Sequence, residues 1–139
     1  MILMDTIVVS EPLRPRGDPR VAAWLDRQGP ESLYISTISV AEVLFGVATL
    51  PAGQRRARLA EAFENEVARL FAGRVLSFDL SAARTCAGVM AAARACGFAI
   101  GVADGQIAAI AAANALSVAT RDEAPFKAAG VETVNPWVG

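Results

Sequence analysis

Four acidic residues in this sequence lie at positions where a carboxylate can do chemistry. Asp5 directly follows a short apolar run, and Asp122 lies just past another, while Glu42 and Asp104 are each expected in the first turn of a helix. If the apolar runs are strands of one parallel sheet, their carboxyl ends meet at one edge, where binding sites belong. Carboxylates gathered there repel one another and raise each other's pKa values, and a Mg²⁺ or Mn²⁺ ion relieves that conflict. Such an ion activates a bound water and stabilises charge on a phosphoryl oxygen, so the pattern indicates metal-assisted phosphodiester hydrolysis.

Each of these carboxylates also has an ordinary structural interpretation. Glu42 could close a capping box, Asp104 could favour the positive end of a helix dipole, and Asp122 could cap the helix after it. Asp5 is harder to explain in this way, because a carboxylate that ends a buried apolar run costs several kcal/mol unless it is paired or metal-bound. No basic residue lies within eight positions of it, which leaves hydroxyl and backbone donors near Thr6 as the structural alternative.

The chain contains no histidine. This excludes Ser-His-Asp and Cys-His nucleophilic pairs, paired-imidazole ribonuclease chemistry and zinc sites with a histidine ligand. The two cysteines, Cys86 and Cys96, fall on one predicted helix roughly 15 Å apart, too far for a disulfide. Free cysteines are typical of a reduced cytosolic protein. Oxygen ligation is therefore the metal chemistry that the sequence offers.

The length and composition indicate one compact domain over residues 1–139. Of these 139 residues, 54% are hydrophobic and 19% are charged. Setting the four acids aside leaves 10 acidic against 13 basic residues, and this small positive excess has the sign that a polyanionic substrate needs. An apolar fraction this high also favours a partner chain on some helix surface, and we expect a homodimer.

Short apolar segments alternate with helical ones along the chain. Strands are predicted over 2–4, 33–35, 75–78, 116–119 and 131–134. Helices are predicted around 21–25, over 39–50 (opened by a capping box from Ser39 to Glu42), over 54–72, from just after Asp79 to Gly97, and over 101–113. This alternation predicts an α/β three-layer α/β/α sandwich around a mostly parallel sheet of about five strands.

No segment is expected to target or cross a membrane. The longest stretch without a charge, Gly105 to Thr120, has 16 residues, short of the roughly 20 that span a bilayer. The N-terminus has no basic region and carries Asp5 inside its apolar run, unlike a signal peptide. We therefore expect a cytoplasmic protein.

Four segments around the acids are similar to motifs of a known family. They are MILMDT around Asp5, ISVAE ending at Glu42, VADGQIAA around Asp104 and ATRD ending at Asp122. Together with the NPW near the C-terminus, and at these separations, they resemble the PIN-domain family over essentially the whole chain. More narrowly, the chain is similar to the VapC toxins of bacterial toxin–antitoxin pairs, close to FitB-type members.

The resemblance implies a PIN-like fold and a Mg²⁺- or Mn²⁺-dependent endoribonuclease. Its catalytic, metal-binding acids match Asp5, Glu42, Asp104 and Asp122, and Thr120 matches a family Ser/Thr near the metal. The resemblance also implies an RNA substrate, a homodimer and a small DNA-binding antitoxin whose C-terminal tail crosses the active site. Operator DNA is then bound only through the antitoxin.

Ile7 departs from the family pattern, which usually reads Asp-x-Asn in the first motif. Isoleucine cannot hydrogen-bond a metal-bound water or orient a neighbouring acid. The loss of such support lowers metal affinity or activity about 10–100-fold. A second hypothesis therefore stays open: a non-catalytic binding module that dimerises and strengthens the grip of its antitoxin on operator DNA. Ile7 also argues against haloacid-dehalogenase-like phosphatases, which need a second Asp there.

Other polar side chains near the acids are candidates to contact the substrate or to hydrogen-bond the acids. These are Thr6, Thr120 and Arg121, and we expect Arg121 to pair with a neighbouring carboxylate because the site is crowded with negative charge.

Basic and aromatic residues further from the acids could either contact RNA or have a purely structural role. The cluster of Arg55, Arg56 and Arg58 could grip RNA phosphate or form a solvated helix face. Trp24 and Trp137 are expected in the core or an interface rather than stacked on bases.

Overall fold

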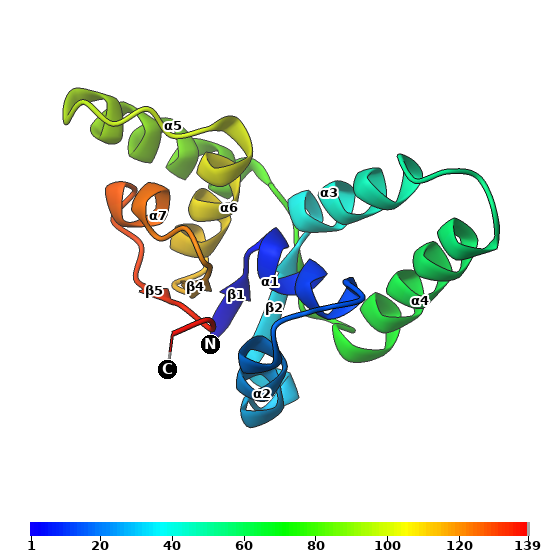
Figure 1. Cartoon of the computed structure of the whole chain (residues 1–139). Helices are drawn as coiled ribbons and strands as arrows, with labels where there is room; N and C mark the ends of the chain where they lie inside the picture. Colours follow the sequence, from blue (N-terminus) through cyan, green and yellow to red (C-terminus); the bar gives the residue numbers. More distant parts are fainter. Residues whose placement is uncertain (139) are drawn as a thin grey trace.

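A computed structural model describes residues 1–138, and Gly139, the last residue of the predicted domain, lies outside the described residues. Its sheet has five strands in the order β3-β2-β1-β4-β5, and every pairing between them is parallel. Figure 1 labels four of them, β2, β1, β4 and β5. The strands are β1 (Ile2–Met4), β2 (Leu33–Ser36), β3 (Val75–Leu76), β4 (Ser117–Ala119) and β5 (Thr133–Val134). The predicted sandwich around a parallel sheet is confirmed.

Helices cover both faces of the sheet. The first face carries α1 (Thr6–Ser10), α2 (Pro19–Arg27), α3 (Thr37–Ala48) and α4 (Gln54–Leu70). The second face carries α5 (Leu80–Ala95), α6 (Val102–Ala113) and α7 (Ala124–Ala128). Two short 3-10 turns, η1 (Glu11–Leu13) and η2 (Pro30–Ser32), flank α2. Within residues 1–138, no helix combines the length and the apolar character that crossing a bilayer requires.

The strands separate two hydrophobic clusters because successive side chains point to opposite faces. In β1, Met4 packs in the cluster under α1–α4, whereas Leu3 packs in the cluster under α5–α7. Ile35 of β2 joins the first cluster and Val118 of β4 joins the second. The strands are therefore apolar on both sides, as the continuous apolar runs in the sequence indicated.

The start of α3 differs from the sequence-based prediction. The helix begins at Thr37, and the hydroxyl of Ser36 caps it by accepting a hydrogen bond from the Ser39 backbone nitrogen at 3.1 Å. The predicted capping box from Ser39 to Glu42 is wrong, because β2 ends at Ser36 and its extended backbone puts that hydroxyl at the helix entrance. Glu42 therefore lies in the second turn of α3, where its side chain has no capping role.

The strand order fixes where a site belongs. From β1 the sheet continues through β2 and β3 on one side and through β4 and β5 on the other. The order reverses between β1 and β4, and in open α/β sheets ligands bind outside the carboxyl ends of the strands at such a switch point. Asp5 directly follows β1 and Thr120 directly follows β4, one on each side of this point.

Candidate active site

Asp5 is held across the switch point. Its backbone nitrogen donates to the Ala119 carbonyl at 2.9 Å and so extends the ladder between β1 and β4. One carboxylate oxygen caps α1 by accepting from the Thr6 nitrogen at 2.8 Å, and the other accepts from the Thr120 hydroxyl at 2.8 Å. The residue is only 9% exposed. Of the donors near Thr6 that the sequence left open, the backbone nitrogen is the one that bonds Asp5, and the hydroxyl of Thr120, just past β4, adds the second hydrogen bond to the carboxylate.

These hydrogen bonds do not compensate the burial of the Asp5 carboxylate. The pKa of Asp5 is raised to about 6, chiefly by burial and further by the carboxylates of Asp104 and Glu42, although the hydrogen bonds from Thr120 and Thr6 act in the opposite direction. A carboxyl whose pKa stays this high lacks a positive partner. The site is therefore built around an uncompensated negative charge.

Asp104 lies in the first turn of α6 and is half-buried. Burial raises its pKa, and the neighbouring carboxylates of Asp122 and then Glu42 raise it further. The four predicted acids are thus close enough to act on one another's charge, although they come from four separate segments of the chain. Gly105 follows Asp104, and a Cβ there would lie 2.5 Å from the Met90 sulfur unless that side chain moved, so α5 packs closely behind this acid.

The ion pairs of the described residues leave all four acids unpaired. They join Arg14 to Glu11, Arg20 to Asp18 and Lys127 to Glu123. The local excess of negative charge is therefore available to a cation.

Glu42 is oriented by a chain of hydroxyl groups. Thr6 donates its hydroxyl proton to Glu42 Oε1 at 2.6 Å, and the oxygens of Thr6 and Ser39 lie 2.9 Å apart. Because Thr6 has one proton and gives it to Glu42, Ser39 must donate to Thr6, and Ser36 donates to Ser39 at 3.4 Å. The three hydroxyls thus donate in sequence toward Glu42, and the last of them, on Thr6, orients one oxygen of its carboxylate.

Sequence reasoning missed the part that Ser36 and Ser39 play here. Both are fully buried, and they connect the end of β2 with the residue after Asp5. For Ser39 the signal lies in the ISVAE segment, where the sequence favours a helix cap, whereas Ser36 lies just before that segment. This chain of hydroxyl groups also compensates for Ile7, which is 37% exposed and cannot donate a hydrogen bond. The preceding residue, Thr6, supplies the hydrogen bond to Glu42 instead.

Asp122 lies just past β4 and is exposed. The next helix, α7, begins at Ala124 with Glu123 at its cap position and no side-chain capping bond. Asp122 therefore does not cap that helix. Its backbone carbonyl lies 3.3 Å from the Thr120 hydroxyl, which ties this loop to the same threonine that bonds Asp5.

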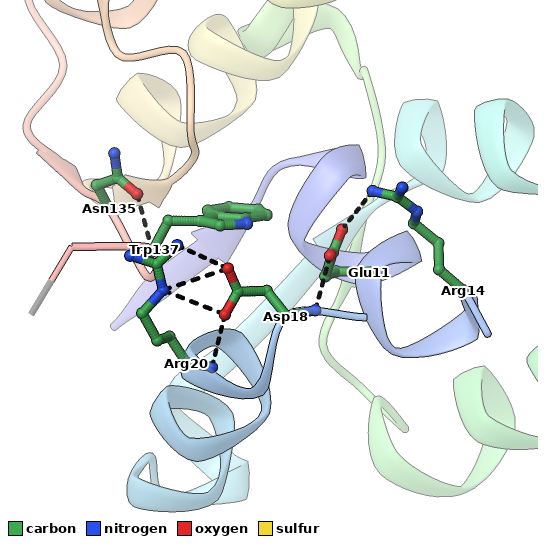
Figure 2. A network of polar contacts seen from close by, with 6 residues as sticks. All are labelled: Glu11, Arg14, Asp18, Arg20, Asn135 and Trp137. Atoms are coloured by element: carbon green, nitrogen blue, oxygen red, sulfur yellow. Dashed lines mark hydrogen bonds and ion pairs between the residues drawn. The ribbon is translucent and has the colours of Figure 1, made fainter. Parts of the chain in front are cut away.

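Arg121 does not form the predicted ion pair with a site carboxylate anywhere in the described chain. Its guanidinium lies 5.3 Å from the ring centroid of Trp137, a cation–π geometry. Trp137 is 3% exposed, and its backbone nitrogen donates to Asn135 Oδ1 at 2.9 Å (Figure 2). Arg121 thus contacts the C-terminal segment instead of the acids. Trp137 is a core residue, as expected.

The donor set can be tested against a divalent cation. No three acidic or cysteine side chains of residues 1–138 stand close enough to form a complete ligand cage. Mg²⁺ does not need one, since it keeps several waters and takes one or two carboxylates directly. Four hard oxygen donors, two of them with pKa values raised by burial and by neighbouring carboxylates, fit such an ion.

This fold and its sequence match a known family. The model of the PIN domain family matches residues 2–132. The chain belongs to the PIN domain family. It is 51% identical to the VapC ribonuclease Y4jK of Sinorhizobium fredii, over 99% of this chain and 98% of the relative. It is 48% identical to Toxin FitB of Neisseria gonorrhoeae, over 99% of both chains.

A solved structure extends the similarity to three dimensions. The structure of FitAB bound to an IR36 DNA fragment contains a chain that is 47% identical, with a TM-score of 0.94 over 99% of this chain and 96% of that one. The resemblance to PIN-domain toxins of the VapC and FitB type is confirmed.

Proposed function

We propose that this chain is a divalent-metal-dependent endoribonuclease and the toxin of a type II toxin–antitoxin pair. The observation that carries the proposal is the meeting of four acids without basic partners at the switch point of the sheet, two of them with raised pKa values. The names of two relatives at about half identity, a VapC ribonuclease and Toxin FitB, support RNA as the substrate and toxicity as the role.

In this proposal Asp5, Glu42, Asp104 and Asp122 hold the ion, one or two of them directly and the others through its waters. When bound, Mg²⁺ or Mn²⁺ supplies a water of lowered pKa and stabilises negative charge on the phosphoryl oxygen. Asp5 is presented by the hydrogen bonds from Thr6 and Thr120, so its carboxylate needs no reorganisation to take up the ion. Glu42 is held by the hydroxyl chain described above. RNA then needs only to place one phosphate over this edge of the sheet.

Partners follow from the same relatives. We propose a cognate DNA-binding antitoxin, and operator DNA bound through it, supported by the DNA-bound FitAB structure. A homodimer is supported by large apolar side chains left exposed, namely Phe45 at 71%, Val102 at 71% and Leu80 at 64%.

We also propose that residues 1–139 form one domain that acts in the cytoplasm. Both hydrophobic clusters pack on the same sheet, so neither has a core independent of the other. Cys86 and Cys96 are free thiols, in agreement with a reducing compartment.

Cleavage of RNA by the antitoxin-free protein tests the enzymatic proposal. A labelled structured RNA is incubated with Mg²⁺, with Mn²⁺ and with EDTA, using the wild type, Asp104→Asn and the control Asp26→Asn. Asp26 is an exposed acid of α2, so its variant changes the charge equally without touching the site. We expect metal-dependent cleavage by the wild type and the control, and none by Asp104→Asn. A folded protein that cuts nothing in either metal contradicts the enzyme and favours the binding module that Ile7 left open.

A further inference from the structure

A hollow of about 320 Å³ opens beside the candidate active site, bordered by α1, α3 and the start of α4. Thr6 and Glu42 of the site are part of its wall, and so are two arginines, Arg14 and Arg55. Much of the remaining surface is apolar, with Leu13, Val47 and Leu59 among its residues. Positive charge and an apolar wall thus share one hollow with a carboxylate of the site.

Arg14 is anchored at this hollow by a buried acid. Glu11 is 4% exposed, and its Oε2 accepts from Arg14 Nη1 at 3.3 Å while its Oε1 accepts from the Asp18 backbone nitrogen at 2.9 Å (Figure 2). The loop packs tightly around it, since a Cβ at Gly17 would lie 2.6 Å from the Glu11 carbonyl oxygen. A bond from one nitrogen leaves the other guanidinium donors of Arg14 for a ligand.

Arg55 lies in the first turn of α4 and is exposed. It takes part in none of the three ion pairs found in residues 1–138. Arg58, one turn further along, is instead bonded to Gln54 Oε1 at 3.1 Å and lies outside the hollow. Of the arginine cluster noted in the sequence, Arg55 is therefore the member placed beside the site.

We propose that this hollow binds the nucleotide next to the scissile phosphate, with its phosphate on Arg14 and Arg55 and its base against the apolar wall. The proposal rests on the proposed function. Away from a bound cation, four carboxylates repel a phosphate chain, so the strand needs compensating positive charge on its path past the site. Guanidinium groups match phosphate oxygens in geometry, and an unstacked base of single-stranded RNA finds an apolar contact. A volume of about 320 Å³ is at the lower end of small-molecule sites, consistent with one nucleotide.

Gly46 provides a way to fill the hollow without disturbing the site. It is exposed on α3 and lines the hollow, and a Cβ there would meet nothing within 4 Å. Gly46→Leu therefore occupies the space meant for the base. Gly88 on α5 is also exposed with nothing within 4 Å, so Gly88→Leu is the matched control.

The test compares Arg55→Ala and Gly46→Leu with their controls Arg58→Ala and Gly88→Leu. Binding of a fluorescein-labelled single-stranded RNA of mixed sequence is followed by anisotropy in EDTA, and KM and kcat are measured separately with Mn²⁺. We expect Arg55→Ala to weaken binding about five- to tenfold and to reduce the slope of log K against log salt by about 0.7, as one lost phosphate contact does. Gly46→Leu should raise KM by a similar factor, with kcat retained, because the acids are untouched.

The outcomes separate this inference from the proposed function. If the wild type cuts RNA and all four variants behave alike, the hollow is not a nucleotide site, although the enzyme stands. If the wild type neither binds nor cuts RNA, both proposals fall. If RNA binding persists in the variants while capture of the antitoxin weakens, the hollow takes a protein segment and the inference is wrong. RNA binding that depends on Arg55 without any cleavage supports the hollow and overturns the enzyme.

Discussion

Replacing Asp5 by asparagine should make the fold more stable at neutral pH while it abolishes cleavage. The carboxylate is buried, and its pKa is raised from 3.8 to about 6, first by that burial. Asparagine keeps nearly the same shape and cannot ionise. Its Oδ1 can still accept from the Thr6 nitrogen, and its amide can donate to Thr120 if that hydroxyl turns to the Asp122 carbonyl at 3.3 Å. The variant therefore removes a buried charge without leaving a polar group unsatisfied.

The size of the effect follows from the two pKa values. At about 1.36 kcal/mol per unit, the difference between 3.8 and about 6 makes the ionised Asp5 about 3 kcal/mol less favourable in the folded than in the unfolded chain. As the pH rises from about 4 to about 6, the folded state holds more protons than the unfolded state, so the free energy of unfolding of the wild type falls. Asparagine resembles the uncharged carboxyl, and the pKa of about 6 already includes the hydrogen bonds to the ionised form. We therefore expect Asp5→Asn to be about 3 kcal/mol more stable at pH 7, with this gain lost by about pH 4.

Urea unfolding in EDTA at a fixed protein concentration, repeated from about pH 4 to pH 8, measures this gain. The control is Asp26→Asn, which changes the net charge equally at an exposed position of α2. Addition of Mg²⁺ should stabilise the wild type and leave Asp5→Asn unchanged, since binding to the folded state alone raises its stability. An asparagine variant that is less stable than the wild type at every pH would show that Asp5 is a structural cap, and the reasoning about the site would be refuted.

Thr6→Val should lower the rate of RNA cleavage about 10–100-fold without unfolding the chain, because Glu42 loses its orienting hydrogen bond. Thr6→Ser keeps the hydroxyl and should retain activity. Cleavage by the valine variant at the wild-type rate would show that the chain of hydroxyls has no positioning role. The kcat/KM of the wild type at subsaturating Mg²⁺ should rise as the pH increases through about 6, because Asp5 must lose its proton to bind the ion, and a flat profile from about pH 5 to pH 7 would contradict this. Phe45→Arg should convert the proposed homodimer into a monomer, because it places a charge where an apolar side chain is 71% exposed. Size-exclusion chromatography with light scattering measures this change. An unchanged mass would exclude Phe45 from the dimer interface.

Much of the fold is encoded locally and was predictable. Parallel strands are buried on both faces, so they appear as short apolar runs, and β1 ends where Asp5 interrupts such a run. The short helix α1 was missed because its TIVVS segment is rich in β-branched residues, whose intrinsic preference is for strands. It forms because the Asp5 side chain caps it, which is a consequence of the site rather than of local propensity.

The candidate site was predictable in its acids but not in their support. The hydroxyls of Thr6 and Ser39 are 33 residues apart in the chain and meet because β1 pairs with β2 with Met4 opposite Ile35. No spacing rule contains that register. Arg121 was assigned to an ion pair from the local charge, whereas the ring of Trp137, brought back by the C-terminal segment, determines its position. The local sequence shows which charged side chains need a partner, whereas tertiary packing determines which partner each of them contacts.

A titration of Mn²⁺ followed by electron paramagnetic resonance tests most directly whether these four acids bind a divalent cation. The free ion gives a strong signal that is lost on binding, so the wild type, Asp104→Asn and Asp26→Asn can be compared without RNA or antitoxin. We expect the wild type and Asp26→Asn to remove Mn²⁺ from solution alike, and Asp104→Asn to bind it at least about tenfold more weakly. Binding that is equal in all three proteins, or absent from the wild type at Mn²⁺ concentrations that support cleavage, would contradict the claim.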